Sequence, residues 1–241
     1  MVAEIKSNPA MSASNFARTW LNRLGPLLGL LLVITIFAAL IGDPQRYLSP
    51  KNLRTVLAQT VIVAIGANGM TMIIISGGID LSVGSVIALT GVITALGING
   101  GMSTTSAIFV GILVGGLVGL VNGLAITRLR VVPFIATLGM LGVARGVAKG
   151  IAGSQTVNMP ETWANNLLLT VPRPEWLLVA PGVWIAMALA IVAAIVLRRT
   201  VFGRRVFALG SNEAAARACG IATDRLKLYI YGLAGLLFGL A

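Results

Sequence analysis

Few side chains in this 241-residue sequence could carry out covalent chemistry. The sequence contains no histidine and a single cysteine, Cys219. A Cys/His metal site, a Ser-His or Cys-His nucleophile and an internal disulfide are therefore excluded for lack of parts. No glycine-rich segment leads into the Gly-Lys-Ser/Thr arrangement that cradles nucleotide phosphates, so any nucleotide energy must come from a partner. The sequence favours binding and positioning roles over catalysis, and we expect that this chain is not an enzyme.

Asp80 is the only charged residue between Thr55 and Thr127. It stands in the segment SGGIDLS, residues 76–82, where glycines interrupt an apolar run. Asp80 could serve chiefly as the N-cap of the next helix. Alternatively, this break could also line or gate a solute path, because broken membrane helices gather polar backbone groups around cavities. On the second interpretation the candidate path residues are Asn68, Gly77, Gly78, Asp80, Ser82, Asn122 and Thr137.

Basic residues gather in a second polar stretch, residues 198–227, between two apolar segments. This stretch holds seven Lys and Arg residues against Glu213 and Asp224, so it must lie in water rather than in lipid. Within it, Ser211 or Asn212 offers an N-cap oxygen, Glu213 suits a first helical turn, and three alanines favour helix propagation. The pattern predicts a short helix presented on one side of the membrane.

The overall composition identifies lipid as the main solvent of the chain. Hydrophobic residues make up 57% of the sequence and charged residues 10%, with a mean hydropathy of +0.94. A soluble domain carries about 25% charged residues. The net charge of +11 does not indicate nucleic-acid binding, because the basic residues fall at the ends of apolar runs, as topology determinants do.

The apolar runs predict an all-α, polytopic transmembrane helical bundle. We expect about six complete spans and a seventh that is cut off by the end of the sequence. Pro26, Pro133 and Pro181 fit the starts of the spans in which they occur. The expected spans are residues 24–41, 56–75, 81–98, 107–126, 133–148 and 177–197, with the partial one beginning near residue 228.

The distribution of basic residues predicts the orientation of these spans. With the N-terminus inside, the tail, the turn at 127–130 and the loop at 198–227 carry twelve Lys and Arg residues, against six in the loops at 42–55 and 145–177. Basic loops remain in the cytoplasm. We therefore expect a retained cytoplasmic tail at residues 1–23, a cytoplasmic loop at 198–227, and an interfacial segment with tryptophans at 149–177.

Glycine recurs every four residues in two of the expected spans. The first repeat comprises Gly111, Gly115, Gly119 and Gly123, and the second comprises Gly142, Gly146 and Gly150. Small residues at this spacing allow helices to approach closely in lipid. We interpret both repeats as packing faces inside a compact bundle.

Three segments together resemble a known family. These segments are GGIDLSVGS (77–85), VNGLAITRLRVVPFIATLG (121–139) and FGRRVFALGSNEAAARACGI (202–221). In this order they are similar to the permease subunits of bacterial ABC importers for monosaccharides of the ribose, xylose, arabinose and galactose group. The resemblance covers most of residues 55–241, and its permease domain would extend over residues 24–241.

The resemblance implies a transmembrane permease subunit of an ATP-driven sugar importer in the bacterial inner membrane. Such a permease pairs with a second copy or a sister subunit and with cytoplasmic ATP-binding subunits, and an extracytoplasmic sugar-binding protein delivers its solute. ATP and Mg would be bound by the partner ATPase and no cofactor by this chain. By this likeness residues 210–220 would form the coupling helix that docks on the ATPase, with contributions from Gly210, Ser211, Asn212, Glu213, Ala214, Ala215, Ala216, Arg217 and Gly220.

Members of this family are longer than this sequence, which stops within an apolar segment at Ala241. We therefore expect a C-terminally incomplete permease domain. An ion-gradient-driven secondary transporter is the alternative function. It would need ionisable groups within the spans for coupling, and only Asp80 qualifies.

Overall fold

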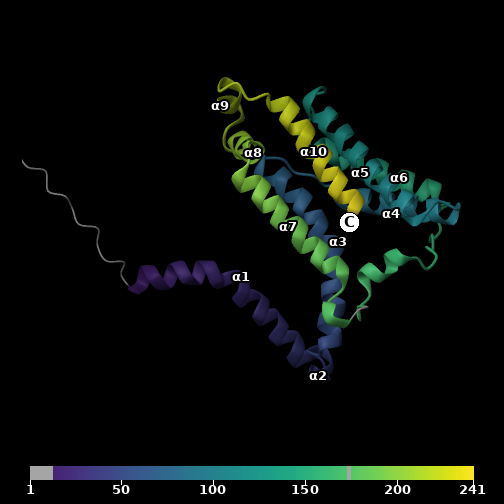
Figure 1. Cartoon of the computed structure of the whole chain (residues 1–241). Coiled ribbons are helices and arrows are strands. Elements are labelled where there is room, and N and C mark those ends of the chain that lie inside the picture. Colours follow the sequence, from purple (N-terminus) through teal and green to yellow (C-terminus); the bar gives the residue numbers. More distant parts are fainter. Residues whose placement is uncertain (1–12, 173–174) are drawn as a thin grey trace, which may run out of the picture. The chain divides into compact units, whose positions relative to one another are not determined.

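The computed structural model describes residues 13–172 and 175–241, with side chains for residues 24–172 and 176–241. This part of the chain forms α-helices and two short 3-10 helices and contains no strand, which confirms the predicted all-α fold (Figure 1). The α-helices are α1 (Ala13–Leu40), α2 (Pro44–Tyr47), α3 (Pro50–Ile75), α4 (Val83–Asn99), α5 (Thr104–Thr127), α6 (Pro133–Ile151), α7 (Pro181–Arg199), α8 (Val201–Ser211), α9 (Glu213–Ala218) and α10 (Thr223–Leu240); the 3-10 helices are η1 (Trp163–Leu168) and η2 (Glu175–Leu177).

The chain divides into two compact units, Met1–Leu53 and Arg54–Ala241. In the first unit, α1 begins at Ala13, so Pro26 lies inside the helix and not in its first turn as predicted. The Asp43 carboxylate caps α2 by accepting a hydrogen bond from the Arg46 N–H at 3.0 Å. Residues 1–12 of the expected cytoplasmic tail lie outside the described residues.

Proline marks the first residue of four helices. Helices α2, α3, α6 and α7 begin at Pro44, Pro50, Pro133 and Pro181. The prolyl ring fixes a helical φ, and its missing N–H would have no partner in a first turn. The prediction of a loop over residues 42–55 is therefore wrong in part. Pro50 starts α3, which is one and a half turns longer than the span expected from residue 56.

Among the described residues, four long helices and two shorter ones are apolar. Helices α3, α5, α6 and α7 are long and apolar enough to cross a bilayer, and Leu24–Leu40 and Val83–Asn99 are shorter apolar helices. The large apolar side chains of α5 point outward, among them Leu113, Leu117 and Leu120, while its glycines are buried. This arrangement, with small residues inside and large ones outside, fits a helix surrounded by lipid. It confirms the polytopic membrane fold.

Helix α10 lies at the centre of the second unit. Ile230, Tyr231, Ala234 and Phe238 are each at most 2% exposed and belong to a core shared with α3, α4, α5, α6 and α8. The helix begins at Thr223, five residues before the predicted start at residue 228, because its first turn carries Asp224 and Arg225 into the aqueous end. The segment expected to be an incomplete span is therefore the most buried helix of the unit.

The first glycine repeat packs against α10, as Figure 1 shows for the neighbouring ribbons of α5 and α10. A Cβ atom built on Gly119 would collide with the carbonyl oxygen of Tyr231, and one on Gly115 with that of Gly235. The packing interpretation of this repeat is confirmed. In α6, by contrast, Cβ atoms on Gly142, Gly146 and Gly150 would meet no atom within 4 Å. The second repeat is therefore not a packing face against any of the described residues.

The stretch at 198–227 contains α8 and α9, which a single residue joins, between the end of α7 and the start of α10. The Asn212 side chain caps α9 by accepting from the Ala215 N–H at 2.9 Å, and Glu213 lies in the first turn, which confirms the predicted short helix. Gly210 and Ser211 belong to the last turn of α8, so the helix does not extend over residues 210–220 as expected.

The segment between α6 and α7 is mostly irregular. The Asn99 side chain ties it to the end of α4 by donating to the Asn158 carbonyl at 3.0 Å. Trp163 and Trp176 are 51% and 75% exposed. Indole rings at the ends of spans suit the membrane–water interface.

Candidate functional site

The break between α3 and α4 forms the centre of a buried polar cluster. Five side chains meet there from four parts of the chain, and none is more than 3% exposed. They come from the α3–α4 connection, from α5, from α6 and from α10. We call this group the Asp80 cluster; its members are Asp80, Ser82, Asn122, Thr137 and Tyr231.

Asp80 itself is not the N-cap of α4. The N-cap residue is Ser82, whose side chain makes no capping bond. Asp80 Oδ1 instead accepts from the Ser82 N–H at 2.7 Å and from the Ser82 hydroxyl at 2.6 Å. The carboxylate therefore fixes the approach to α4 from two residues before it. The prediction that Asp80 is the N-cap of α4 is therefore wrong.

The hydrogen bonds of this cluster extend to α5 and α6. Asn122 Nδ2 donates to Ser82 Oγ at 3.1 Å. Thr137 Oγ1 accepts from the Leu81 N–H at 3.2 Å and donates to the Pro133 carbonyl at 2.9 Å. These hydrogen bonds hold α5 and α6 against the break. Because Asn122 and Thr137 are buried, losing a partner would leave a polar group unsatisfied, which is costly.

Tyr231 of α10 completes the cluster. Its hydroxyl lies 3.5 Å from the Ile79 carbonyl, and a Cβ atom on Gly78 would approach that hydroxyl to 2.7 Å. Gly78 is therefore needed for the close passage of the chain beneath α10. Sequence analysis missed Tyr231, because Tyr229 beside it has the same chemistry and the same apolar surroundings in sequence. Only burial separates them, at 2% and 59% exposed.

Burial dominates the electrostatics of Asp80, which lies in the connection between two spans. Loss of hydration raises the pKa of its carboxyl above the ordinary value, and the hydrogen bonds from Ser82 and Asn122 act in the opposite direction. Among the described residues the carboxylate forms no ion pair, and its hydrogen bonds come from the neutral N–H and hydroxyl groups of Ser82.

Asn68 lies apart from the Asp80 cluster. It lines a groove of about 360 Å³ between α3 and α7, together with Thr60, Thr71 and small or apolar side chains. Asn68 Nδ2 donates to the Ala64 carbonyl of its own helix at 3.0 Å, and Thr71 Oγ1 to the Ala67 carbonyl at 2.7 Å. Of the candidate path residues, the structure brings Asp80, Ser82, Asn122 and Thr137 together in a closed core and leaves Asn68 on an open groove.

The short helix α9 is fixed to the start of α10 by ion pairs. Lys227 Nζ lies 2.8 Å from both carboxylate oxygens of Glu213, and Arg217 is 3.1 Å from Asp224 and 3.4 Å from Glu213. Ala216, on the inner face of α9, is buried and only 5% exposed. The opposite face of α9, formed by Ala214, Ala215 and Ala218, is exposed. Cys219 is exposed as well.

Helix α8 connects this surface to the break in the membrane helices. A Cβ atom on Gly210 would collide with the Ile75 carbonyl oxygen at the end of α3, and Gly77 lies beside Gly210 as well. Gly77 takes a φ of +83°, which a residue with a side chain rarely adopts. The backbone of α8 therefore rests directly on the residues that lead into the Asp80 cluster.

Comparisons with known proteins agree with this arrangement. A family model described as "Branched-chain amino acid transport system / permease component" matches residues 52–241. The ribose import permease protein of Escherichia coli strain K12 is 37% identical over 228 residues, covering 94% of this chain and 70% of that protein. The counterpart from Bacillus subtilis strain 168 is 39% identical over 228 residues, covering 92% and 67%.

A more distant relative transports a different solute. The autoinducer 2 import system permease protein of Yersinia pestis strain Pestoides F is 31% identical over 215 residues, covering 88% of this chain and 59% of that protein. No solved structure matches the chain.

Proposed function

Because the chain belongs to the family of permease components described above, we propose that it is the transmembrane permease subunit of an ATP-driven sugar importer. The single observation that carries this proposal is the 37–39% identity to ribose import permeases along more than nine tenths of the chain. Its family and its apolar helices support a multi-pass protein of the bacterial inner membrane. The proposed solute is a monosaccharide, since the relatives named for ribose are more similar than the relative named for autoinducer 2.

The proposed partners follow from the same premise. An extracytoplasmic binding protein delivers the sugar, and a separate cytoplasmic subunit binds ATP and Mg and hydrolyses the nucleotide. A second permease copy completes the path. We place the N-terminus, the turn at 127–130 and the 198–227 stretch in the cytoplasm, because basic residues concentrate in them. The turn and the stretch lie at one end of the second unit, where both line one pocket.

Helix α9 is the proposed docking site for the ATPase subunit. Its exposed alanine face is small enough to enter a groove, while the Glu213–Lys227 and Arg217–Asp224 pairs hold its other side on α10. Exposed ion pairs contribute only about 0–1 kcal/mol each. Together with the Asn212 cap and the buried Ala216, however, they make α9 and the first turn of α10 move as one piece.

Movement of α9 would reach the membrane helices through two contacts. One is the backbone contact of Gly210 in α8 with Ile75 in α3. The other is α10, whose Tyr231 reaches the Ile79 carbonyl. Both end at the Asp80 cluster, which in turn holds α5 and α6. A displacement of the docking helix would therefore tilt packed helices as rigid bodies, as in other domain movements.

The sugar path is proposed to follow the groove between α3 and α7, on which Asn68 and Thr71 lie. This groove is open, and the three polar side chains among its mostly apolar lining, Thr60, Asn68 and Thr71 of α3, can hydrogen-bond a hydroxyl group. The Asp80 cluster is proposed to be the lock at the cytoplasmic end of the helices rather than a surface that the sugar touches, since its polar atoms are buried and bonded to one another.

The docking proposal can be tested by co-purification with the ATPase subunit from the native host. The informative variant is Ala215→Arg, because Ala215 is exposed and its N–H, which Asn212 caps, is retained. We expect recovery of the ATPase to fall roughly tenfold, as for loss of a central interface position. Gly210→Arg is unsuitable, since any side chain there collides with α3.

Thr105→Arg provides the matched control. It places the same side chain at an exposed position in the first turn of α5, at the end of that helix away from the turn at 127–130. Equal ATPase recovery from wild type and Ala215→Arg, with both proteins folded in the membrane, would refute docking through α9. Sugar uptake that persists in cells depleted of ATP would refute the importer itself.

A further inference from the structure

We propose that an anionic phospholipid binds in the groove between α5 and α10, with its phosphate in a basic pocket at the start of α10 and one acyl chain along the two helices. The inference depends on the chain spanning a membrane and on no particular sugar or partner. It rests on three features: a pocket rich in arginine, unused hydrogen-bond donors at its base, and a separate apolar groove further along the same two helices.

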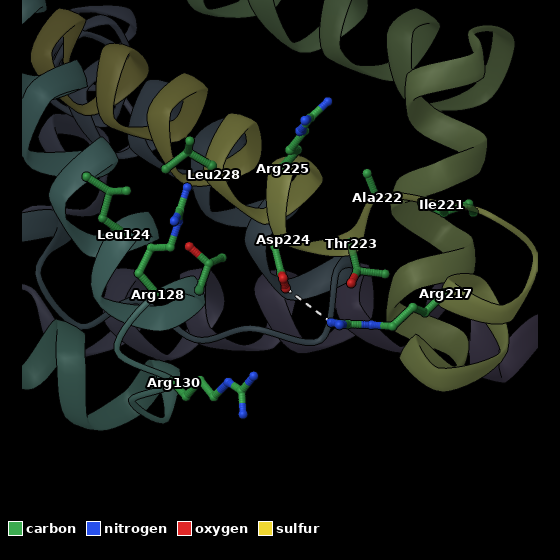
Figure 2. Close-up of a pocket in the computed structure, with 11 residues that line it drawn as sticks. Leu124, Arg128, Arg130, Arg217, Ile221, Ala222, Thr223, Asp224, Arg225 and Leu228 are labelled. Carbon is green, nitrogen blue, oxygen red and sulfur yellow. Dashed lines mark hydrogen bonds and ion pairs between the residues drawn. The ribbon is translucent and has the colours of Figure 1, made fainter.

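The basic pocket has a volume of about 510 Å³ and lies between the end of α5, α9 and the first turn of α10 (Figure 2). Four arginines line it against one aspartate. Arg217 is already paired with Asp224, and Figure 2 shows Arg225 pointing away from that pair. No acidic side chain within the described residues pairs with Arg128 or Arg130. Their two guanidinium groups therefore leave a net positive charge in the pocket.

Arg130 has an unusual backbone conformation for an arginine. Its φ of 55° lies in the left-handed region, which glycine or asparagine would adopt at lower cost. The turn it forms is closed by the Val131 N–H, which donates to the Ala125 carbonyl at 3.2 Å. This turn carries Arg130, which is one of the arginines that line the pocket.

The base of the pocket offers donors that no protein group satisfies. Thr223 is 2% exposed, and its hydroxyl has no hydrogen-bond partner although it is buried. In Figure 2 this hydroxyl faces the side of the pocket where Arg217 and Asp224 meet. The N-cap of α10 is Ala222, which has no side-chain acceptor for the first N–H groups of that helix. Free N–H groups at a helix start and an unused hydroxyl are the partners that a phosphate oxygen requires.

A separate apolar groove lies further along the same two helices, α5 and α10. It has a volume of about 270 Å³, and its lining includes Leu117 and Leu120 of α5 and Leu233 of α10. Leu120, Leu124 and Arg128 follow at intervals of four residues, so they lie on one face of α5. Figure 2 shows Arg128 between Leu124 and Leu228, where the basic pocket meets the apolar side chains.

The combination of the two cavities selects the ligand. A soluble phosphate compound or an acidic peptide would occupy the basic pocket and leave the apolar groove empty. A phospholipid with an anionic headgroup fills both, because its phosphate and its acyl chain are joined at the boundary that Arg128 occupies. Basic pockets between membrane helices on the cytoplasmic side are suited to anionic headgroups.

The proposal can be tested with the full chain purified in mild detergent. Native mass spectrometry and thermal unfolding would be measured with added phosphatidylglycerol, phosphatidylcholine or inorganic phosphate. We expect one phosphatidylglycerol to remain bound and to raise the unfolding temperature. Phosphatidylcholine carries the same phosphate but adds a cationic choline group, which the arginines of the pocket repel, so it should bind roughly tenfold more weakly.

Two variants localise the site. Arg128→Gln with Arg130→Gln should abolish retention of phosphatidylglycerol, whereas Arg198→Gln with Arg199→Gln removes two exposed arginines from the last turn of α7 and should not. Thr223→Val removes the unpartnered hydroxyl and keeps the shape of the side chain. We expect it to weaken phosphatidylglycerol binding several-fold without lowering the unfolding temperature of the lipid-free protein.

Three results would overturn the proposal. Equal losses in the two arginine pairs would mean that charge attracts lipid without a site. Equal binding of phosphatidylglycerol and phosphatidylcholine would exclude recognition of the anionic headgroup. Displacement of the bound lipid by inorganic phosphate at the same concentration would assign the pocket to a soluble anion.

Discussion

The glycine repeats of α5 and α6 have the same spacing but different surroundings. In α5, Gly115 and Gly119 lie so close to α10 that a methyl group would meet its backbone, and the contact is reciprocal at Gly235. In α6, Gly142 and Gly146 have open space where a side chain would be. A four-residue glycine repeat therefore indicates that a helix can be approached closely. It does not tell which neighbour, if any, makes the approach within one chain.

The largest effect should distinguish these two repeats directly. Gly119→Ala forces a methyl group against the Tyr231 carbonyl and Gly235. Overpacking of this kind should lower the free energy of unfolding by about 3 kcal/mol. Gly146→Ala adds a methyl group in open space and should stabilise α6 by about 0.5–1 kcal/mol. Thermal unfolding in detergent measures both changes. Similar unfolding temperatures for the two variants would contradict the observed packing of α5 on α10.

A pair of asparagines extends the comparison from packing to hydrogen bonds. Asn122 is 1% exposed and bonded to Ser82, whereas Asn68 lies half-buried on the groove between α3 and α7. Asn122→Ala should cost about 2 kcal/mol, because it leaves a buried hydroxyl without its donor. Asn68→Ala should change stability by less than about 0.5 kcal/mol.

The same two variants separate stability from transport. If the groove carries the sugar, Asn68→Ala lowers sugar uptake while the unfolding temperature stays at the wild-type value. Uptake assays on cells with matched amounts of membrane protein provide the measurement. Wild-type uptake by Asn68→Ala would remove Asn68 from the proposed path, and a stable Asn122→Ala protein would show that the Asp80 cluster does not hold the helices together.

The smallest effect concerns the two tyrosines of α10. The Tyr231 hydroxyl lies 3.5 Å from the Ile79 carbonyl, which is a long hydrogen bond, so Tyr231→Phe should cost no more than about 0.5–1 kcal/mol. Tyr229 is 59% exposed, and Tyr229→Phe should leave stability unchanged. A lower unfolding temperature for Tyr229→Phe than for Tyr231→Phe would contradict the role of Tyr231 in the Asp80 cluster.

Much of the fold could be predicted because the relevant signals are local. Pro133 and Pro181 mark helix starts by their fixed φ, and Asn212 with Glu213 marks the start of α9. Pro50 was misinterpreted as a loop residue, since a proline is compatible with a turn as well as with a first helical position. The start of α10 was missed because Asp224 and Arg225 interrupt hydropathy without interrupting the helix.

The candidate site could be predicted only in part. Asp80 was identifiable from its charge within an apolar region, and its neighbour Ser82 from proximity in sequence. The separation of Asn122 and Thr137 from Asn68 could not be predicted, because all three are uncharged polar residues in apolar spans. Which of them meet depends on the crossing of α4, α5 and α6, and sequence periodicity carries no information about which helices are neighbours.

The sequence by itself determined that this protein is an all-α membrane protein, where most of its helices lie, and that it presents a short basic helical stretch outside the lipid. These properties follow from hydropathy, charge and capping, which act over a few residues at a time. The tertiary structure decided that α10 is the central helix and that one glycine repeat is packed while the other is open. It also decided that Gly210 brings α8 against the residues that lead into the Asp80 cluster. These properties depend on contacts between residues far apart in the chain, where shape complementarity and not residue type selects the partner.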